Sequence, residues 1–329
     1  MRTLMPFAAM LFAANIASAE TLTIYTYDSF TAEWGPGPKI EAAFEKRCGC
    51  DVEFVGLEDA VAILSRLQFE GDATEADVAL GLDTGLIAEA KATGLFAPHG
   101  ADLSGIEVPG GFADDVFVPY DYGYFAFIYD DTRVATPPGS LKDLVEAADG
   151  PSLLIQDPRT SSPGLGLMLW MRKVYGDGAA DAWEKLAPRI VTVTPGWSEA
   201  YGLFQKGEAD MVLSYTTSPA YHIAVENETK YKAAAFAEGH YMQIEVAARL
   251  AGADNPELAG SFLDFLVSEE AQAVIPTTQW MFPVRKVPGA MPEAFEALVT
   301  VDDPLVFSPD EVSKNRKDWV AEWREALSR

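Results

Sequence analysis

With 329 residues, of which 49% are hydrophobic and 22% charged, the sequence has the composition of a folded globular protein and is long enough for two lobes with separate cores. Its 50 Asp and Glu residues against 24 Lys and Arg give a formal net charge of −26. This excess of acid argues against a nucleic-acid partner, because binding to a phosphate backbone needs basic patches. The acidic field favours the approach of a cation, although acidity more commonly serves solubility.

The first 19 residues have the pattern of an export signal. Arg2 precedes an apolar run at 4–16, and Ala17-Ser18-Ala19 has the small residues of a cleavage site. The run is shorter than the roughly 20 apolar residues that a membrane-spanning helix needs. We therefore expect 1–19 to be a cleaved signal peptide and the protein to act in the periplasm.

From residue 21 onward, short strand-like runs alternate with amphipathic helical stretches, which is typical of parallel α/β layers. In the first part, strands are predicted at 22–26, 52–55 and 78–82, with helices ending near Gly49, Gly71 and Gly94. The long aromatic run at 116–129 is predicted to be a strand that crosses between two lobes.

The second part repeats the alternation. Helices are predicted at 140–148, 162–175, 179–187, 197–206 and from Ser218, which would cap its helix, and strands at 152–155, 190–193 and 209–215. The run 241–247 is predicted to be a returning strand, followed by helices at 256–267 and 268–275 and a final helix that opens with the capping box Ser308 to Glu311.

Cys48 and Cys50 are the two cysteines of the chain. In an oxidising compartment they can close a small disulfide, and two free thiols are the alternative. His99, His222 and His240 show no metal-ligand spacing to the cysteines or to each other, so no metal site is predicted.

Candidate binding residues follow the ends of the predicted strands, where open parallel sheets bind their ligands. These positions hold Tyr27, Asp59, Asp83, Asp157 to Ser162, Trp197 and the run from Tyr215 to Ser218, with Tyr221 one turn later. Aromatic rings and carboxylates suit a flat organic cation, and the hydroxyls of serines at helix starts suit a phosphate or hydroxyl tail. Each carboxylate taken alone is also an ordinary helix cap, and each tyrosine an ordinary core residue.

No catalytic motif is visible: the sequence has no nucleophile elbow, no HExxH and no phosphate-binding glycine loop. We therefore predict a binding protein and not an enzyme. A secreted hydrolase built on Asp59 and Asp83 is the alternative from a different class.

Several stretches carry a family resemblance. They are 25–30, 34–38, 48–50, 117–127, 156–160, 196–202, 213–222 and 238–241. With these stretches the sequence resembles the periplasmic thiamine-binding proteins of thiamine ABC importers over nearly its whole length.

The resemblance implies an α/β protein of the type II periplasmic-binding-protein fold: two lobes, each a mixed sheet flanked by helices, joined by crossing strands. The implied lobes are 20–120 with 245–288 and 121–244 with 289–329, and the ligand cleft lies between them. The protein would close on thiamine or its mono- or diphosphate and deliver it to a membrane permease, as a monomer without a cofactor.

Site residues follow from the resemblance by position. Those implied to meet the phosphate or hydroxyethyl end are Asp59, Ala60, Ser161, Ser162 and Trp197. Those implied to meet the ligand from the second lobe are Tyr215, Thr216, Thr217 and Ser218, and those implied to supply ring faces are Tyr27, Tyr221 and Trp280. Relatives have glycine where Ala60 stands, and its methyl group restricts the backbone if a positive φ is required there.

A binding protein for another cation, a polyamine or ferric ion, is the nearest alternative. Ferric sites use adjacent tyrosines with a carboxylate or histidine, and Tyr215, Tyr221 and His222 could imitate such a site.

Overall fold

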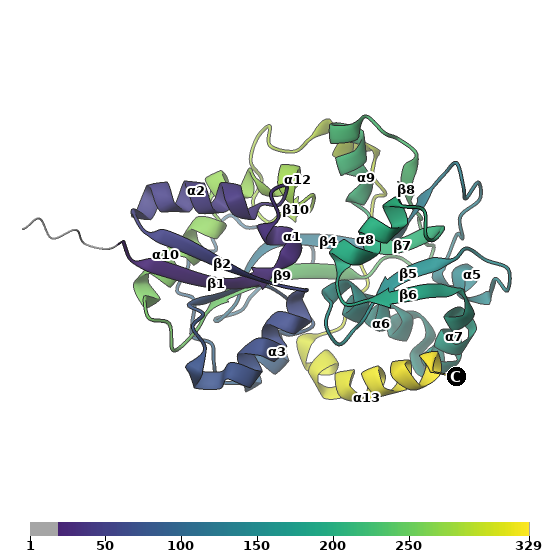
Figure 1. Cartoon of the computed structure of the whole chain (residues 1–329), viewed down its shortest axis with the longest axis horizontal. Helices are drawn as coiled ribbons and strands as arrows, with labels where there is room; N and C mark the ends of the chain where they lie inside the picture. The colour runs from purple at the N-terminus through teal and green to yellow at the C-terminus, as the bar shows by residue number, and fades with distance from the viewer. Residues whose placement is uncertain (1–18, 329) are drawn as a thin grey trace, which may run out of the picture.

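The strand β4 (Val118–Asp130) passes from one half of the molecule to the other, as the computed structural model of residues 19–328 shows (Figure 1). Residues 118–124 of β4 pair antiparallel with β9 (Met242–Arg249), and residues 125–129 pair antiparallel with β7 (Met211–Tyr215). The strands therefore form one path, in the order β2 (Asp51–Leu57), β1 (Thr21–Tyr27), β3 (Val78–Asp83), β9, β4, β7, β5 (Leu153–Gln156) and β6 (Ile190–Thr194). Both predicted crossing segments are strands, and the prediction of a two-lobed α/β fold is confirmed.

The first lobe is built on parallel strands. The strand β1 pairs in parallel with both β2 and β3, which places all three carboxyl ends at one edge. Its strands are β1 (Thr21–Tyr27), β2 (Asp51–Leu57) and β3 (Val78–Asp83). Its helices are α1 (Asp28–Thr31), α2 (Gly37–Cys48), α3 (Ala60–Glu70), α4 (Ile87–Ala92), α10 (Pro256–Leu266), α11 (Glu269–Gln272) and α12 (Ile275–Thr278), with a short 3-10 turn at Gly71–Ala73.

The second lobe is also parallel at its centre, since β5 pairs in parallel with β6 and β7. Its further strands are β5 (Leu153–Gln156), β6 (Ile190–Thr194) and β8 (Tyr231–Ala233). Its helices are α5 (Leu141–Glu146), α6 (Ser162–Tyr175), α7 (Ala179–Leu186), α8 (Trp197–Gln205) and α9 (Ser218–Tyr221), with 3-10 turns at Gly176–Gly178 and Ala187–Arg189 and a π-helix at His222–Glu226. The short strand β10 (Phe282–Pro283) pairs with β4, and a 3-10 turn at Glu293–Ala297 follows it.

The last helix, α13 (Pro309–Leu327), begins with the predicted capping box, in which Ser308 and Glu311 bond each other's backbone N–H groups. It runs along the lower edge of the molecule in Figure 1 and packs on α4, α6 and α7. Arg316 pairs with Glu89 of the first lobe, and Glu322 pairs with Arg172 of the second. The chain end therefore connects both lobes. We retain the lobe boundaries given above as a proposal.

Two local predictions differ from the structure. Ser218 does not cap the helix that follows it: α9 is a single turn whose preceding residue is Thr217, and the Ser218 hydroxyl instead accepts from the Tyr215 N–H at 3.2 Å. The helix expected at 268–275 is divided into α11 and α12. In the first case a polar side chain bonds a neighbour that sequence periodicity does not reveal.

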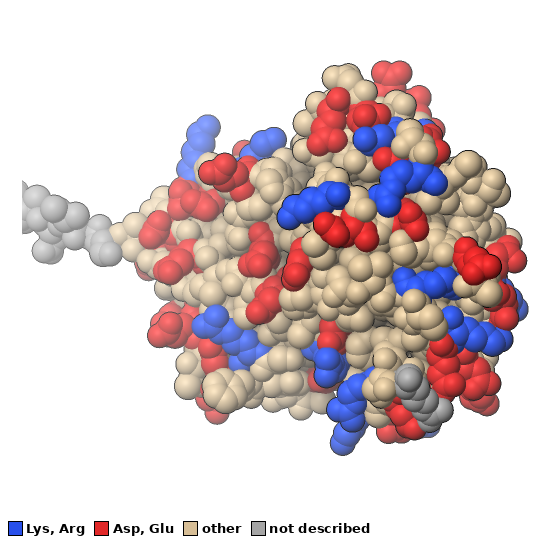
Figure 2. Space-filling model, turned by 45° about the vertical axis from the view of Figure 1, so that its right-hand side comes forward, with Lys and Arg blue, Asp and Glu red and all other residues tan. Residues whose placement is uncertain are grey.

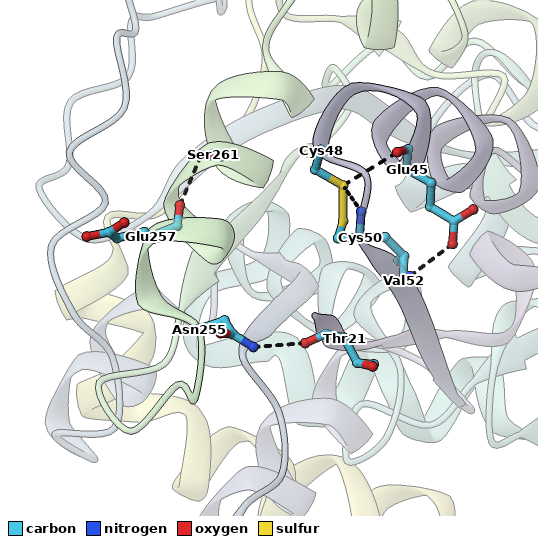
Figure 3. The surroundings of a disulfide bond; sticks show 8 residues. All are labelled: Thr21, Glu45, Cys48, Cys50, Val52, Asn255, Glu257 and Ser261. Atoms are coloured by element: carbon cyan, nitrogen blue, oxygen red, sulfur yellow. Dashed lines mark hydrogen bonds between the residues drawn. A yellow bond between two sulfur atoms is a disulfide. The ribbon is translucent and has the colours of Figure 1, made fainter. Parts of the chain in front are cut away.

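The two cysteines form a disulfide between the end of α2 and the start of β2 (Figure 3). Beside it, the Glu45 carboxylate accepts a hydrogen bond from the Val52 N–H at 3.0 Å, so the same turn is fixed by a second contact. The loop is too short for chain entropy to contribute much, and the bond is best understood as a local clip.

The excess of acidic residues is visible on the surface of the protein. Acidic side chains are spread over the face shown in Figure 2, with basic side chains between them.

No helix within residues 19–328 has both the length and the apolar character to cross a membrane. The predicted signal peptide lies outside the described residues, apart from Ala19.

A β-bulge in β3 brings the backbone close to an aromatic ring. The register between β3 and β9 shifts between Leu80 and Leu82, and Gly81 at the shift has φ +99°. A Cβ placed on Gly81 would lie 2.2 Å from the Tyr27 ring. Only glycine satisfies both the backbone conformation and the close approach.

We predict that Gly81→Ala lowers the melting temperature by about 2 to 6 °C, because it adds backbone strain and a clash with Tyr27. Thermal unfolding followed by circular dichroism measures this. Gly260→Ala is the matched control, since Gly260 lies inside α10 with no atom within 4 Å of its added Cβ. Equal melting temperatures for the Gly81 variant and the parent protein would contradict the prediction.

Candidate functional site

A cavity of about 250 Å³ lies where the two lobes meet, at the carboxyl ends of β1 and β7. Most of the predicted site residues line it: Tyr27, Asp59, Ser162, Trp197, Tyr215, Thr217, Ser218, Tyr221 and Trp280. Segments far apart in the sequence thus meet at one place, as binding at strand ends requires. The volume suits one small molecule.

Three predicted residues lie behind this lining. Ala60 is the first residue of α3 and is buried. Ser161 is buried and donates its hydroxyl hydrogen to Asp59 at 2.7 Å. Thr216 is buried, and its hydroxyl has no hydrogen-bond partner among the described residues. Within residues 19–328, the non-glycine residues with positive φ are Asn227 and Trp280, so Ala60 occupies a position that needs no glycine.

Aromatic rings form much of the wall. Trp197 stacks on Tyr201 with ring centroids 4.9 Å apart, and its indole N–H donates to the Ser214 hydroxyl at 2.7 Å. On the other side, Tyr221 meets Trp280 edge to face at 5.7 Å. Trp34 is 54% exposed and lies 6.3 Å from Trp197, at the rim of the cavity. Rings held in this way offer faces to a cation or to a flat heterocycle.

Trp280 is held by an unusual backbone. Its φ of +58° lies in the left-handed region, which a bulky residue rarely adopts. The indole stacks on Phe295, and the preceding Gln279 donates its side-chain N–H to the Tyr27 hydroxyl. The Phe295 ring and the hydrogen bond of the neighbouring Gln279 thus hold Trp280 in the cavity wall. Strained backbone of this kind is often found in binding sites.

Asp59 joins the two lobes through its carboxylate. It caps α3 by accepting from the Ala60 N–H at 2.8 Å, and it accepts from three groups of the second lobe: the Ser161 hydroxyl, the Ser162 N–H at 3.3 Å and the Trp197 N–H at 3.4 Å. Burial raises the pKa of Asp59 to about 6, although these four hydrogen bonds favour its ionised form. The expectation that Asp59 is a helix cap and the expectation that it is a site residue are both compatible with this geometry.

Glu245 lies in the cavity floor, and sequence reasoning missed it. Its carboxylate accepts from the Tyr27 hydroxyl at 2.6 Å, from the Tyr120 hydroxyl and from the Gln243 amide at 2.8 Å. Burial raises the pKa of Glu245 to about 7. A signal was present, because an acidic residue in the middle of the mostly apolar strand β9 is costly unless it has a role.

Ser29, which follows the first predicted strand, also lines the cavity. The other lining residues that sequence reasoning did not select are Trp34, Gly81, Pro163, Ser198, Tyr201, Gly202, Gln205, Gln279 and Met281. Trp34 and Tyr201 lie inside stretches that carry the family resemblance, so position along the chain could have found them. No Lys or Arg lines the cavity in the part of the chain that the structure describes. The lining is therefore aromatic and acidic, with hydroxyl groups at one end.

His222, one of the three residues that could imitate a ferric site, does not line the cavity. His222 is fully buried, with Nε2 2.8 Å from the Tyr201 hydroxyl and Nδ1 2.6 Å from Glu226. Tyr215 donates its hydroxyl hydrogen to Gln243 at 3.0 Å. Both nitrogens of His222 are thus engaged by other side chains of the protein, and residues 19–328 hold no cluster of three His, Cys, Asp or Glu suited to a metal ion.

Comparison with known proteins identifies the class. Residues 30–273 match the family described as bacterial extracellular solute-binding protein, and the chain belongs to that family. It is 56% identical over 324 residues to the thiamine-binding periplasmic protein of Brucella suis biovar 1, covering 98% of this chain and 97% of that protein. It is 55% identical over 320 residues to the thiamine-binding periplasmic protein of Escherichia coli K12, covering 97% of each.

A solved structure is similar over the same length. A periplasmic thiamin binding protein superimposes with a TM-score of 0.93 at 54% sequence identity, covering 99% of this chain and 100% of that one. The fold implied by the sequence resemblance, two lobes of mixed α/β structure with crossing strands, is thereby confirmed.

We predict that the ligand-free protein melts about 1 to 2 °C higher at pH 6.5 than at pH 8. Burial raises the pKa values of Asp59 to about 6 and Glu245 to about 7, whereas the unfolded chain has carboxyl pKa values near 4. The folded state therefore binds protons more tightly, and its stability rises as the pH falls through 7. Differential scanning calorimetry at constant ionic strength measures the difference.

Glu245→Gln is the control for this measurement, because it removes the group that titrates nearest neutrality and should flatten the profile. The range stops at pH 6.5 because burial lowers the pKa of His240, which opposes the gain at more acidic pH. A melting temperature that falls from pH 8 to pH 6.5 would show that these carboxyl groups do not titrate as described.

Proposed function

We propose that the protein binds thiamine in the cavity between its lobes and delivers it unaltered to the permease of an ABC transporter. The observation that carries the proposal is the lining: buried carboxylates and aromatic rings surround a cavity that no Lys or Arg of the described residues enters. The negative charge of these carboxylates is not balanced by a positive side chain in the lining, so binding of a cation there is favourable. The similarity to thiamine-binding periplasmic proteins over nearly the whole chain supports the choice of ligand.

Thiamine matches both the carboxylates and the aromatic rings of the cavity lining. Its thiazolium ring carries a fixed positive charge, which gains from nearby carboxylates and from the faces of tyrosine and tryptophan rings. Its aminopyrimidine is flat and offers hydrogen-bond donors and acceptors. Glu245 at the cavity floor and Trp280 in the wall supply the corresponding groups.

The end of the cavity near Asp59 suits the hydroxyethyl arm. Ser162 and Trp197 are the first residues of α6 and α8, so backbone N–H groups of two helices point toward this end. Helix starts and serine hydroxyls hold hydroxyl groups and phosphates equally well. Thiamine monophosphate and diphosphate are therefore part of the proposal.

Transport follows from the two-lobed design. Closure around a ligand is favoured only by contacts made in the closed state, and Asp59 and Trp197 already make such contacts across the cleft. A permease that recognises the closed shape would receive loaded protein selectively. We propose that this cycle takes place in the periplasm, after removal of the predicted signal peptide.

Titration of ligand-free protein with thiamine tests the proposal. Protein unfolded in denaturant, dialysed and refolded should bind one thiamine per chain by isothermal calorimetry, with quenching of tryptophan fluorescence. Spermidine and ferric citrate are the competing ligands. Binding of either of these, with no heat from thiamine, would reject thiamine in favour of another cation, and chemical conversion of recovered thiamine would reject a purely binding role.

We predict that Tyr221→Ala weakens thiamine binding by about 3- to 30-fold, the range expected for one cation–π contact. The melting temperature of the ligand-free protein should change little, because Tyr221 is only partly buried. Tyr129→Ala is the matched control, since Tyr129 lies on β4 away from the cavity lining. Equal losses of affinity and stability in the Tyr221 variant would indicate a packing role instead.

A further inference from the structure

Three carboxyl groups form a row across neighbouring strands beneath the cavity. Asp83 of β3 pairs in register with Glu245 of β9, and Glu245 pairs in register with Asp121 of β4. Directly opposed residues on antiparallel strands project to the same face, with Cβ atoms about 5 Å apart. Glu245, which lies more than 120 positions from both Asp83 and Asp121 in the sequence, is thus brought into one acidic row with them.

The three groups differ in their hydrogen bonds. Glu245 accepts from three donors, and Asp83 accepts from the Ser162 hydroxyl and from the Gly85 N–H at 2.7 Å. Asp121 is 0% exposed, and neither of its carboxyl oxygens has a hydrogen-bond partner in residues 19–328. A buried carboxylate without donors is the costliest member of such a row to ionise.

Among residues 19–328, no Lys or Arg side chain pairs with Glu245 or Asp121, the central pair of the row. The titratable groups that face Glu245 and Asp121 from the surrounding elements are Tyr27 of β1, Asp59 before α3, Asp83 of β3, Tyr120 of β4 and Tyr215 of β7. Arg316 of α13 acts on Asp83 at the end of the row. Burial and the neighbouring Glu245 raise the pKa of Asp121 well above its ordinary value.

We infer that Asp121 stays protonated and neutral behind the cavity, whereas Glu245 binds the positive charge of the ligand. When the ligand binds, Glu245 releases its proton to solvent. This rests on the proposed binding of thiamine. Glu245 lines the cavity and Asp121 does not, so only Glu245 is placed to face the ligand charge. The cation replaces the proton as the charge that neutralises Glu245, and the proton of Asp121 stays in place.

The consequence is an affinity that depends on pH. Since Glu245 has a pKa of about 7 in the empty protein, the proton must be displaced at pH 6 but is mostly absent at pH 8. Thiamine should bind about tenfold more weakly at pH 6 than at pH 8. At pH 7, calorimetry in buffers of different ionisation enthalpy should show release of about half a proton per thiamine bound.

Two isosteric variants separate the roles. Glu245→Gln should bind thiamine more weakly at pH 8, show no proton release and lose the pH dependence. Asp121→Asn should keep both the affinity at pH 8 and the proton release, because asparagine is similar in shape and charge to a protonated aspartate. Glu53→Gln is the matched control, since Glu53 is exposed on β2 outside the cavity.

The outcomes distinguish this inference from the proposed function. A dissociation constant that is the same at pH 6 and pH 8 would overturn the inference while leaving thiamine binding intact. An Asp121→Asn variant at least tenfold weaker at pH 8 would show that Asp121 is ionised and also overturn it. Absence of thiamine binding by the unmodified protein at any pH would reject the proposed function itself.

Discussion

Burial of four carboxyl groups at the junction of the two lobes, where no Lys or Arg of residues 19–328 lines the cavity, is the constraint on which the rest of the structure depends. Asp59, Asp83, Asp121 and Glu245 are each less than 10% exposed. Taking such groups out of water is unfavourable unless hydrogen bonds, protons or a bound cation compensate them. The protein supplies donors to three of them, and the remaining compensation is left to a proton and to the ligand.

This arrangement explains why the cavity walls are built as they are. Tyr27 reaches Glu245 only because Gly81 leaves room for its ring, and Gln279 holds the same hydroxyl from the segment that carries Trp280. A floor of hydrogen-bonded carboxylates and a wall of fixed rings are therefore parts of one network. An organic cation, the proposed ligand, would satisfy both at once.

Asp59, another of these buried carboxylates, connects the two lobes. Its carboxylate accepts from the first residues of α6 and α8 while it caps α3, so a single side chain ties helix starts of both lobes together. The closed arrangement is thereby favoured at the end of the cavity where the ligand tail is proposed to lie. In the proposed function, ligand recognition and lobe closure would share residues, as a binding protein that signals its loaded state requires.

The sequence by itself determined the alternation of strands and helices, the crossing strands, the capping box of α13 and the strand-end residues such as Tyr27, Asp59 and Trp197. These depend on local periodicity, on turn residues and on the rule that ligands bind at strand ends. Only the tertiary structure decided that Asp121 lies beside Glu245, that His222 is turned away from the cavity and that Ser218 bonds Tyr215. These contacts depend on strand register and side-chain packing, which no local pattern encodes.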